Sequence, residues 1–126
     1  MLKRVILALV SFLLIACSNN SNIAKNSLNN QKIKIYYIHR DNCPACAYMD
    51  RVLQNSEVKS IINRDFKVIV VDINHQDMLP DSSMITGVTP TFYYLNNNNK
   101  QIAKPSHTLT VKELINKLNE VKKARE

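Results

Sequence analysis

The pattern of apolar and polar positions divides the chain into a short apolar segment, a polar segment and a longer patterned region. Residues 5–15 are almost entirely apolar, and residues 18–32 are polar with almost no apolar periodicity. From Ile33 onward, apolar residues recur at the spacings of strands and amphipathic helices. About ninety residues of this kind can bury a modest hydrophobic core. We therefore predict one folded domain over residues 33–126.

Three runs rich in β-branched and aromatic residues predict strands at residues 33–38, 66–73 and 91–95. The second run contains four consecutive apolar residues, 68–71, which is typical of a buried, central strand. The asparagines at residues 96–99 predict a turn, because Asn tolerates left-handed backbone angles. Residues 100–103 are then expected to form a fourth strand that completes a hairpin.

Helices are predicted where apolar residues share one helical face. The first begins at Pro44, whose missing N–H costs nothing at the first helical position. Its apolar face is formed by Tyr48, Met49, Val52 and Leu53. Ser56 is expected to cap a second helix, and residues 74–87 form a connection that is partly helical. Thr110 and Glu113 have the spacing of a capping box that begins a final helix.

The order of these elements is strand–helix–strand followed by strand–strand–helix. A strand–helix–strand unit requires a right-handed crossover and a parallel strand pair, whereas a hairpin adds an antiparallel pair. The sequence therefore predicts an α/β fold with a mixed four-stranded sheet flanked by helices.

The apolar segment at residues 5–15 follows two basic residues, Lys3 and Arg4, and leads to the small residue Ala16. It is too short to span a bilayer comfortably. This layout is typical of a secretory signal peptide, which we predict over residues 1–16. An uncleaved membrane anchor is the alternative.

The four residues Leu14-Ile15-Ala16-Cys17 resemble the signal of bacterial lipoproteins. In that class of proteins the cysteine becomes the first residue of the mature chain and carries acyl groups. The resemblance implies a stable lipid anchor on Cys17, a flexible tether over residues 17–32 and a location in the bacterial cell envelope. Ser18, and not Asp, follows the cysteine, and in lipoproteins of two-membrane bacteria this resemblance implies the outer membrane.

Lys and Arg number 17 and Asp and Glu number 10, so the net charge is +7. A positive surplus is compatible with attraction to anionic headgroups and equally with solubility. The sequence has no basic cluster interleaved with aromatic residues, so nucleic-acid binding is not expected.

The most informative chemical feature is Cys43-Pro44-Ala45-Cys46, which holds two of the three cysteines. A helix that begins at Pro44 places Cys43 at its N-cap, where free backbone N–H groups and the helix dipole favour the thiolate. The thiolate is the species that attacks disulfides. Cys46 lies almost one turn later and is expected to face inward, where it can attack a mixed disulfide on Cys43.

Other interpretations of these two cysteines stay open. A structural disulfide that closes so small a loop stabilises little. Half of a zinc site is a further alternative, but no second Cys-x-x-Cys is present and His39, His75 and His107 are scattered. Idle thiols are not expected in an oxidising compartment. We predict no metal and no cofactor.

The segment Val88-Thr89-Pro90-Thr91-Phe92 lies after the dithiol and after the second predicted strand. A strand, Cys-x-x-Cys at a helix start, an apolar strand and Thr-Pro before a hairpin together resemble the thioredoxin family, over about residues 33–124. The resemblance implies that Pro90 is cis, beside the dithiol, and that Thr89 and Pro90 bind an extended partner peptide. A trans proline opening an edge strand is the ordinary alternative.

Residues 39–46 and 56–59 are similar to the secreted thioredoxin-like proteins. The chain also departs from the family. The buried acid that many thioredoxins carry on the first strand falls at Tyr37, and Gly87 is the only glycine. These departures leave the group that deprotonates Cys46 unidentified.

The resemblance implies a membrane-anchored thiol–disulfide oxidoreductase outside the cytoplasm. It is expected to reduce or isomerise disulfides of envelope proteins and to be re-reduced by a membrane thiol reductase. The uncharged Pro44-Ala45 pair between the sulfurs favours this direction. A disulfide-donating oxidase, a thiol peroxidase and a lipoprotein binding module with a structural disulfide are the alternatives.

Overall fold

The computed structural model describes residues 31–125. Its strands are β1 (Ile33–His39), β2 (Phe66–Asp72) and β3 (Thr91–Leu95). Its α-helices are α3 (Pro44–Leu53), α4 (Ser56–Asp65) and α5 (Val111–Ala124), and two 3-10 helices, η2 (Ile73–Met78) and η3 (Ser82–Met84), connect β2 to β3. The predicted signal peptide and the predicted lipidation site, Cys17, lie outside the described residues. Within residues 31–125, no helix has the length and apolar character needed to cross a bilayer.

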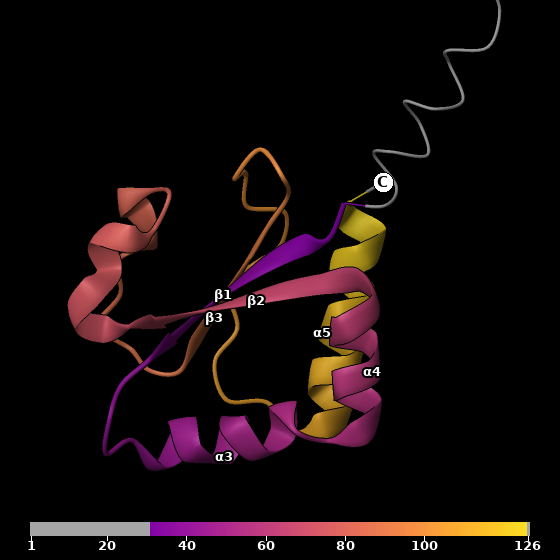
Figure 1. Ribbon diagram of the computed structural model, residues 1–126, viewed down its shortest axis with the longest axis horizontal. Coiled ribbons are helices and arrows are strands. Elements are labelled where there is room, and N and C mark those ends of the chain that lie inside the picture. Colours follow the sequence, from indigo (N-terminus) through magenta and orange to yellow (C-terminus); the bar gives the residue numbers. More distant parts are fainter. Residues whose placement is uncertain (1–30, 126) are drawn as a thin grey trace, which may run out of the picture. The chain divides into compact units, whose positions relative to one another are not determined.

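The sheet has the strand order β2-β1-β3 (Figure 1). β1 pairs with β2 in parallel along its whole length and with β3 in the antiparallel direction. The predicted mixed sheet is therefore confirmed, but β1 is the central strand and β2 is an edge. The prediction that β2 is central was wrong, and Val70 on β2 is 61% exposed. An apolar run indicates that a strand packs against the hydrophobic core. It does not indicate whether the strand has neighbouring strands on one side or on both.

The predicted fourth strand is absent from the described part of the chain, so the sheet has three strands instead of four. Residues 100–103 contribute only an isolated bridge between Leu95 and Gln101, and a second bridge joins Phe92 to Ser106. If the antiparallel pairing of Leu95 with Gln101 continued without interruption, residue 104 would lie opposite Phe92, whereas Phe92 pairs with Ser106. Two extra residues therefore interrupt the ladder, and one residue in the gap, Pro105, has no N–H to donate.

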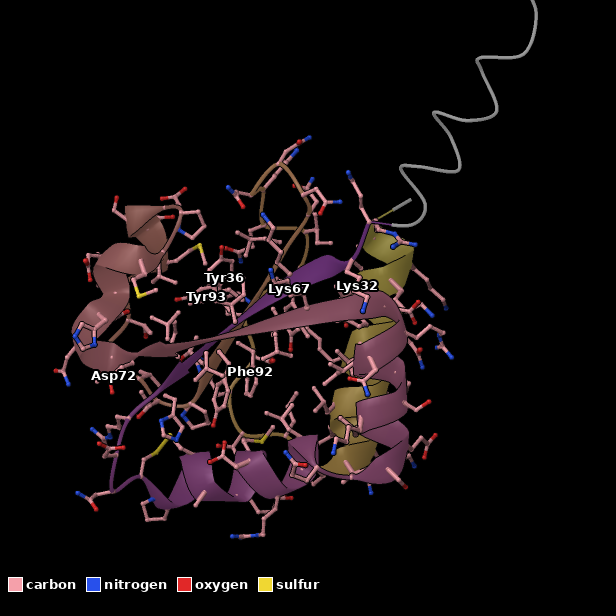
Figure 2. The ribbon with its side chains drawn as sticks, viewed as in Figure 1. Lys32, Tyr36, Lys67, Asp72, Phe92 and Tyr93 are labelled. Carbon is pink, nitrogen blue, oxygen red and sulfur yellow. A yellow bond between two sulfur atoms is a disulfide. The ribbon has the colours of Figure 1, made fainter. Side chains whose placement is uncertain are left out.

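Two hydrophobic clusters cover the two faces of the sheet. One face packs against α3, α4 and α5, and the other packs against the η2–η3 segment (Figure 1). Figure 2 shows Tyr36 and Tyr93 on the η2–η3 face and Phe92 on the helical face. The predicted apolar face of α3 is confirmed, because Met49 and Val52 are buried.

The helix starts follow local hydrogen bonding. Thr110 and Glu113 form the predicted capping box of α5. The side chain of Asn55, and not that of Ser56, caps α4 by accepting from the N–H groups of Glu57 and Val58. An Asn side chain is as good a cap as Ser, so the sequence offered two adjacent candidates and the prediction chose the wrong one.

Candidate functional site

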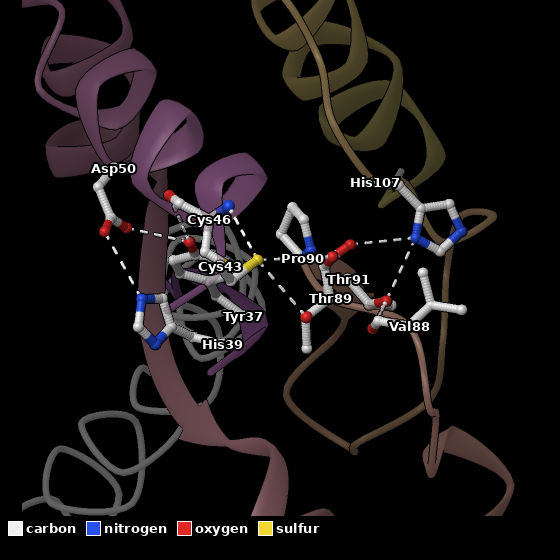
Figure 3. Close-up of a disulfide and its surroundings, with 10 residues drawn as sticks. All are labelled: Tyr37, His39, Cys43, Cys46, Asp50, Val88, Thr89, Pro90, Thr91 and His107. Atoms are coloured by element: carbon white, nitrogen blue, oxygen red, sulfur yellow. Dashed lines mark hydrogen bonds and ion pairs between the residues drawn. A yellow bond between two sulfur atoms is a disulfide. The ribbon is translucent and has the colours of Figure 1, made fainter. Parts of the chain in front are cut away.

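Cys43 occupies the N-cap of α3, as predicted. Asn42, with φ of 54°, turns the chain out of the loop after β1, and Pro44 takes the first turn of the helix. The backbone N–H of Cys46 donates to Cys43 Sγ at 3.2 Å (Figure 3). The Cys43 sulfur therefore accepts a hydrogen bond from one of the N–H groups that have no partner within the helix.

A disulfide joins Cys43 to Cys46, with their Cα atoms 5.2 Å apart. Cys46 has no exposed surface, whereas Cys43 keeps 7% of its surface exposed. The two sulfurs are therefore inequivalent, and only Cys43 is open to a partner. This is the arrangement that the sequence predicted for an attacking cysteine and a buried resolving one.

Thr89 and Pro90 lie directly opposite Cys43. The Thr89–Pro90 peptide bond is cis, as the family resemblance implied. Cys43 Sγ lies 3.6 Å from Thr89 Oγ1 and 3.8 Å from the Thr89 carbonyl oxygen. The structure thus brings together the four residues that the sequence singled out in the domain. Val88, beside them, is 54% exposed, so the loop presents an apolar side chain at the rim of the site.

Side-chain hydrogen bonds hold the loop of Thr89 in place, and the sequence analysis did not find them. Thr91 Oγ1 donates to the Val88 carbonyl at 2.7 Å. His107 Nδ1 lies 3.1 Å from the Pro90 carbonyl and 3.2 Å from Thr91 Oγ1 (Figure 3). A carbonyl oxygen only accepts, so His107 Nδ1 carries a proton and donates to it. His107 therefore acts as a clamp for the loop.

Gln76 on η2 fixes the same loop from the other side. Its Nε2 donates to the Thr86 carbonyl and its Oε1 accepts from the Thr86 N–H, both at 2.8 Å. Thr86 Oγ1 in turn accepts from the N–H of Val88 at 3.1 Å. Hydrogen bonds from both sides therefore hold the segment that faces Cys43.

Tyr37 and Asp50 lie next to the buried cysteine. The Tyr37 hydroxyl donates to Asp50 Oδ1 at 3.0 Å and lies 3.3 Å from the Cys46 carbonyl oxygen. Burial raises the pKa of Tyr37 well above its usual range, and the hydrogen bond and charge of Asp50 raise it further. The hydroxyl therefore keeps its proton at neutral pH. His39 Nε2 lies 3.6 Å from the second carboxylate oxygen of Asp50.

A hollow of about 390 Å³ opens beside the dithiol. Its lining includes Cys43, Ala47, His39 and Asp50. Within residues 31–125, no group of three His, Cys, Asp or Glu side chains is placed to hold a metal ion. Cys43 and Asp50 therefore border the same open hollow.

No protein-family model and no curated protein matches the chain. Solved structures do resemble it. A thioredoxin from Thermus thermophilus aligns with a TM-score of 0.62 and 19% identity, covering 81% of this chain and 82% of its own. A protein described as DsbH Oxidoreductase aligns with a TM-score of 0.63 and 18% identity, covering 84% and 83%.

A disulphide isomerase from Xylella fastidiosa Temecula1 aligns with a TM-score of 0.57 and 13% identity, covering 87% of this chain and 97% of its own. The chain has a thioredoxin-like fold. At these identities the likeness concerns the fold, so the chemistry has to be argued from the residues of this chain.

Proposed function

We propose that the protein is a thiol–disulfide oxidoreductase in which Cys43 attacks and Cys46 resolves. The observation that carries the proposal is the position of Cys43 Sγ, which accepts the Cys46 N–H at a helix N-cap and faces Thr89 Oγ1 at 3.6 Å. A helix N-cap favours the thiolate, and the loop opposite offers free backbone groups to an extended peptide. A structural disulfide needs neither feature.

The reaction has two exchange steps. The Cys43 thiolate attacks a disulfide of the partner, forms a mixed disulfide and releases one partner thiolate. The Cys46 thiolate then attacks Cys43 Sγ, so that the Cys43–Cys46 bond forms and the bond from Cys43 to the partner breaks. The partner gains two electrons and the dithiol loses two. The disulfide-bonded protein described above is the product of the second step.

We propose that this chemistry reduces or isomerises disulfides of envelope proteins, with a membrane thiol reductase as the electron donor. The uncharged Pro44-Ala45 pair supports this direction, because it adds no positive charge to stabilise the thiolate further. Donation of the disulfide to folding proteins is the reverse reaction of the same residues. The reduction potential of the dithiol, measured by its equilibrium with glutathione, decides between the two directions. A difference of about 30 mV in this potential changes the equilibrium constant tenfold.

The proposed location is the bacterial cell envelope, with a lipid on Cys17 and residues 17–32 as the tether. The apolar segment before Cys17 and the polar segment after it support this proposal. The intact mass of the purified mature chain tests it. A chain that begins at Cys17 and carries acyl groups is expected, and an unmodified Cys17 would exclude the lipid anchor.

Reduction of insulin by the purified protein, with dithiothreitol as the electron source, tests the enzymatic proposal. Cys43→Ser is expected to abolish the reaction, whereas Cys17→Ser leaves it unchanged because Cys17 takes no part in the exchange. Cys46→Ser is expected to accumulate mixed disulfides between Cys43 and partner proteins, visible on non-reducing gels. Full activity of Cys43→Ser would show that Cys43 is not the attacking residue, whereas a wild-type protein that reduces no insulin would favour a binding module whose disulfide is structural.

A further inference from the structure

The resolving step needs a proton acceptor that the sequence did not reveal. Cys46 is fully buried, and a buried thiol does not ionise readily without a base nearby. Two titratable side chains lie near Cys46. The Tyr37 hydroxyl lies 3.3 Å from the Cys46 carbonyl oxygen, and it donates a hydrogen bond to Asp50. His107 is engaged by Pro90 on the opposite side of the dithiol.

Local geometry places Asp50 on the correct side of its helix. Asp50 follows Cys46 by four residues on α3, so the two side chains leave the same helical face one turn apart. Tyr37 approaches from β1, and its ring is held by a stack on Phe92 with centroids 4.5 Å apart and planes inclined by 7°. A ring held in this way delivers its hydroxyl to a fixed point between Cys46 and Asp50 (Figure 3).

We propose that Asp50, acting through the Tyr37 hydroxyl, receives the proton that Cys46 loses when it attacks the mixed disulfide. This inference rests on the proposed two-step exchange. The Tyr37 proton passes to Asp50 Oδ1, to which the hydroxyl is bonded, and the Tyr37 oxygen, which lies against the Cys46 backbone carbonyl, takes up the proton that Cys46 releases. The Cys46 thiolate then forms the bond to Cys43 Sγ, and the partner sulfur leaves with the electron pair of the broken bond.

The raised pKa of Tyr37 agrees with this task, because the hydroxyl stays protonated and always has a proton to pass to Asp50. Tyr37 ends the step neutral, as it began, since it gains one proton and gives one away. Asp50 and Tyr37 therefore act on Cys46 without a buried charge on the tyrosine. Before the step the negative charge resides on the Asp50 carboxylate, which is in contact with water, and after the step it has left with the partner thiolate.

Asp50 is placed to exchange this proton with solvent. Its side chain is 51% exposed. It borders the hollow that also contains Cys43, and it borders a second hollow of about 300 Å³ together with Tyr37 and Lys59. The basic side chains that face Asp50 are His39 on β1, whose Nε2 lies 3.6 Å from the carboxylate, and Lys59 on α4, which lines the second hollow.

The test is the reaction of the reduced protein with 5,5′-dithiobis(2-nitrobenzoate), a small aromatic disulfide that releases a coloured thiolate. The first release reports the attack by Cys43, and the second reports the attack by Cys46 on the mixed disulfide. Asp50→Asn and Tyr37→Phe are compared with two matched controls. Asp77→Asn removes an exposed carboxylate on η2, and Tyr36→Phe removes the hydroxyl on the opposite face of the sheet.

We expect both test variants to keep the first rate and to lower the second rate about tenfold or more at neutral pH. The second rate of the variants should rise with pH more steeply than that of the wild type, because hydroxide replaces the missing acceptor. The double variant should be no slower than the slower single variant, since the two residues form one path. Both controls should keep both rates.

A second rate in Asp50→Asn that equals the wild-type rate at every pH would overturn the inference. Asp50 is half exposed, so this variant is expected to fold even where Tyr37→Phe does not. A wild-type first rate no faster than that of an ordinary thiol would instead overturn the proposed function. The two failures are therefore distinguishable in one experiment.

Discussion

Cys43 and Cys46 are separated by two residues, yet their surroundings differ in the ways that govern thiol chemistry. Cys43 accepts a backbone N–H and keeps some exposed surface, whereas Cys46 has none. Thr89 faces Cys43, and the Tyr37–Asp50 pair lies next to Cys46. The two cysteines therefore have different surroundings, which supports the proposal that Cys43 attacks and Cys46 resolves.

The His107 clamp gives a prediction at the scale of one residue. His107→Ala is expected to lower kcat/KM for insulin reduction about fivefold, because one lost hydrogen bond is worth about 1 kcal/mol and the loop of Thr89 loosens. The reaction of Cys43 with a small aromatic disulfide should not change, since that reagent makes no backbone pairing with the loop.

His75→Ala is the matched control, because His75 is exposed on η2 and contacts Asp72 instead of the loop. It is expected to keep both activities. Equal insulin reduction by the two variants would show that His107 does not position the loop.

Cys43 and Cys46 were predicted as neighbours from their spacing at a helix start, and Thr89 and Pro90 were placed beside them by the resemblance to the thioredoxin family. Asp50 and His107 carried no such signal. Asp50 contacts Tyr37 across 13 residues, and His107 contacts Thr91 across 16. Such contacts depend on how β1, α3 and the segment after β3 pack, which a residue pattern does not report.

At the scale of elements, the caps and apolar faces of the helices could be predicted more reliably than the partners of the strands. The capping box of α5 depends on residues three positions apart. The position of β2 at the edge of the sheet depends on which strands pair with β1. The interruption of the fourth strand depends on the pairing of Ser106 with Phe92, which is two residues out of register with the pairing of Gln101 with Leu95. Local rules do not contain that information.

The capping box predicts a measurable contribution to stability. Thr110→Ala removes the side chain that accepts the N–H of Glu113, and it is expected to lower the free energy of unfolding by about 1 kcal/mol. Urea denaturation measures the change. Thr108→Ala, two residues before the cap, is the control and should change the free energy by much less. A Thr110→Ala midpoint that matches the control would contradict the role of the cap.

At the scale of the whole molecule, α4 and α5 are joined at one end by Asp65. Its carboxylate lies 2.9 Å from Lys122 Nζ on α5 and 2.9 Å from the neighbouring Arg64 Nε. Burial alone would raise the pKa of Asp65, but the hydrogen bonds and charges of Lys122 and Arg64 outweigh it and hold the pKa below its usual value. The ion pair therefore stabilises the fold above the ordinary pKa of an Asp side chain.

This arrangement predicts how stability depends on pH. Lys122→Gln is expected to lower the free energy of unfolding by roughly 0.5–1 kcal/mol at neutral pH. Because the folded pKa lies below the unfolded one, the difference from wild type should shrink as the pH falls from about 5 toward 2.

The exposed neighbour Lys123 supplies the control, and Lys123→Gln should change stability little at any pH. A Lys122→Gln difference that persists unchanged in acid would mean that the lysine acts through packing and not through its charge.

The central claim is that Cys43 is a reactive thiolate, and the rate of its alkylation in the reduced protein tests that claim most directly. Iodoacetamide modification, mapped by mass spectrometry, should reach Cys43 about tenfold or more faster than Cys46 at neutral pH and should vary little between about pH 6 and 8. A Cys43 rate that instead climbs about tenfold per pH unit through this range, as for an ordinary thiol, would contradict the account.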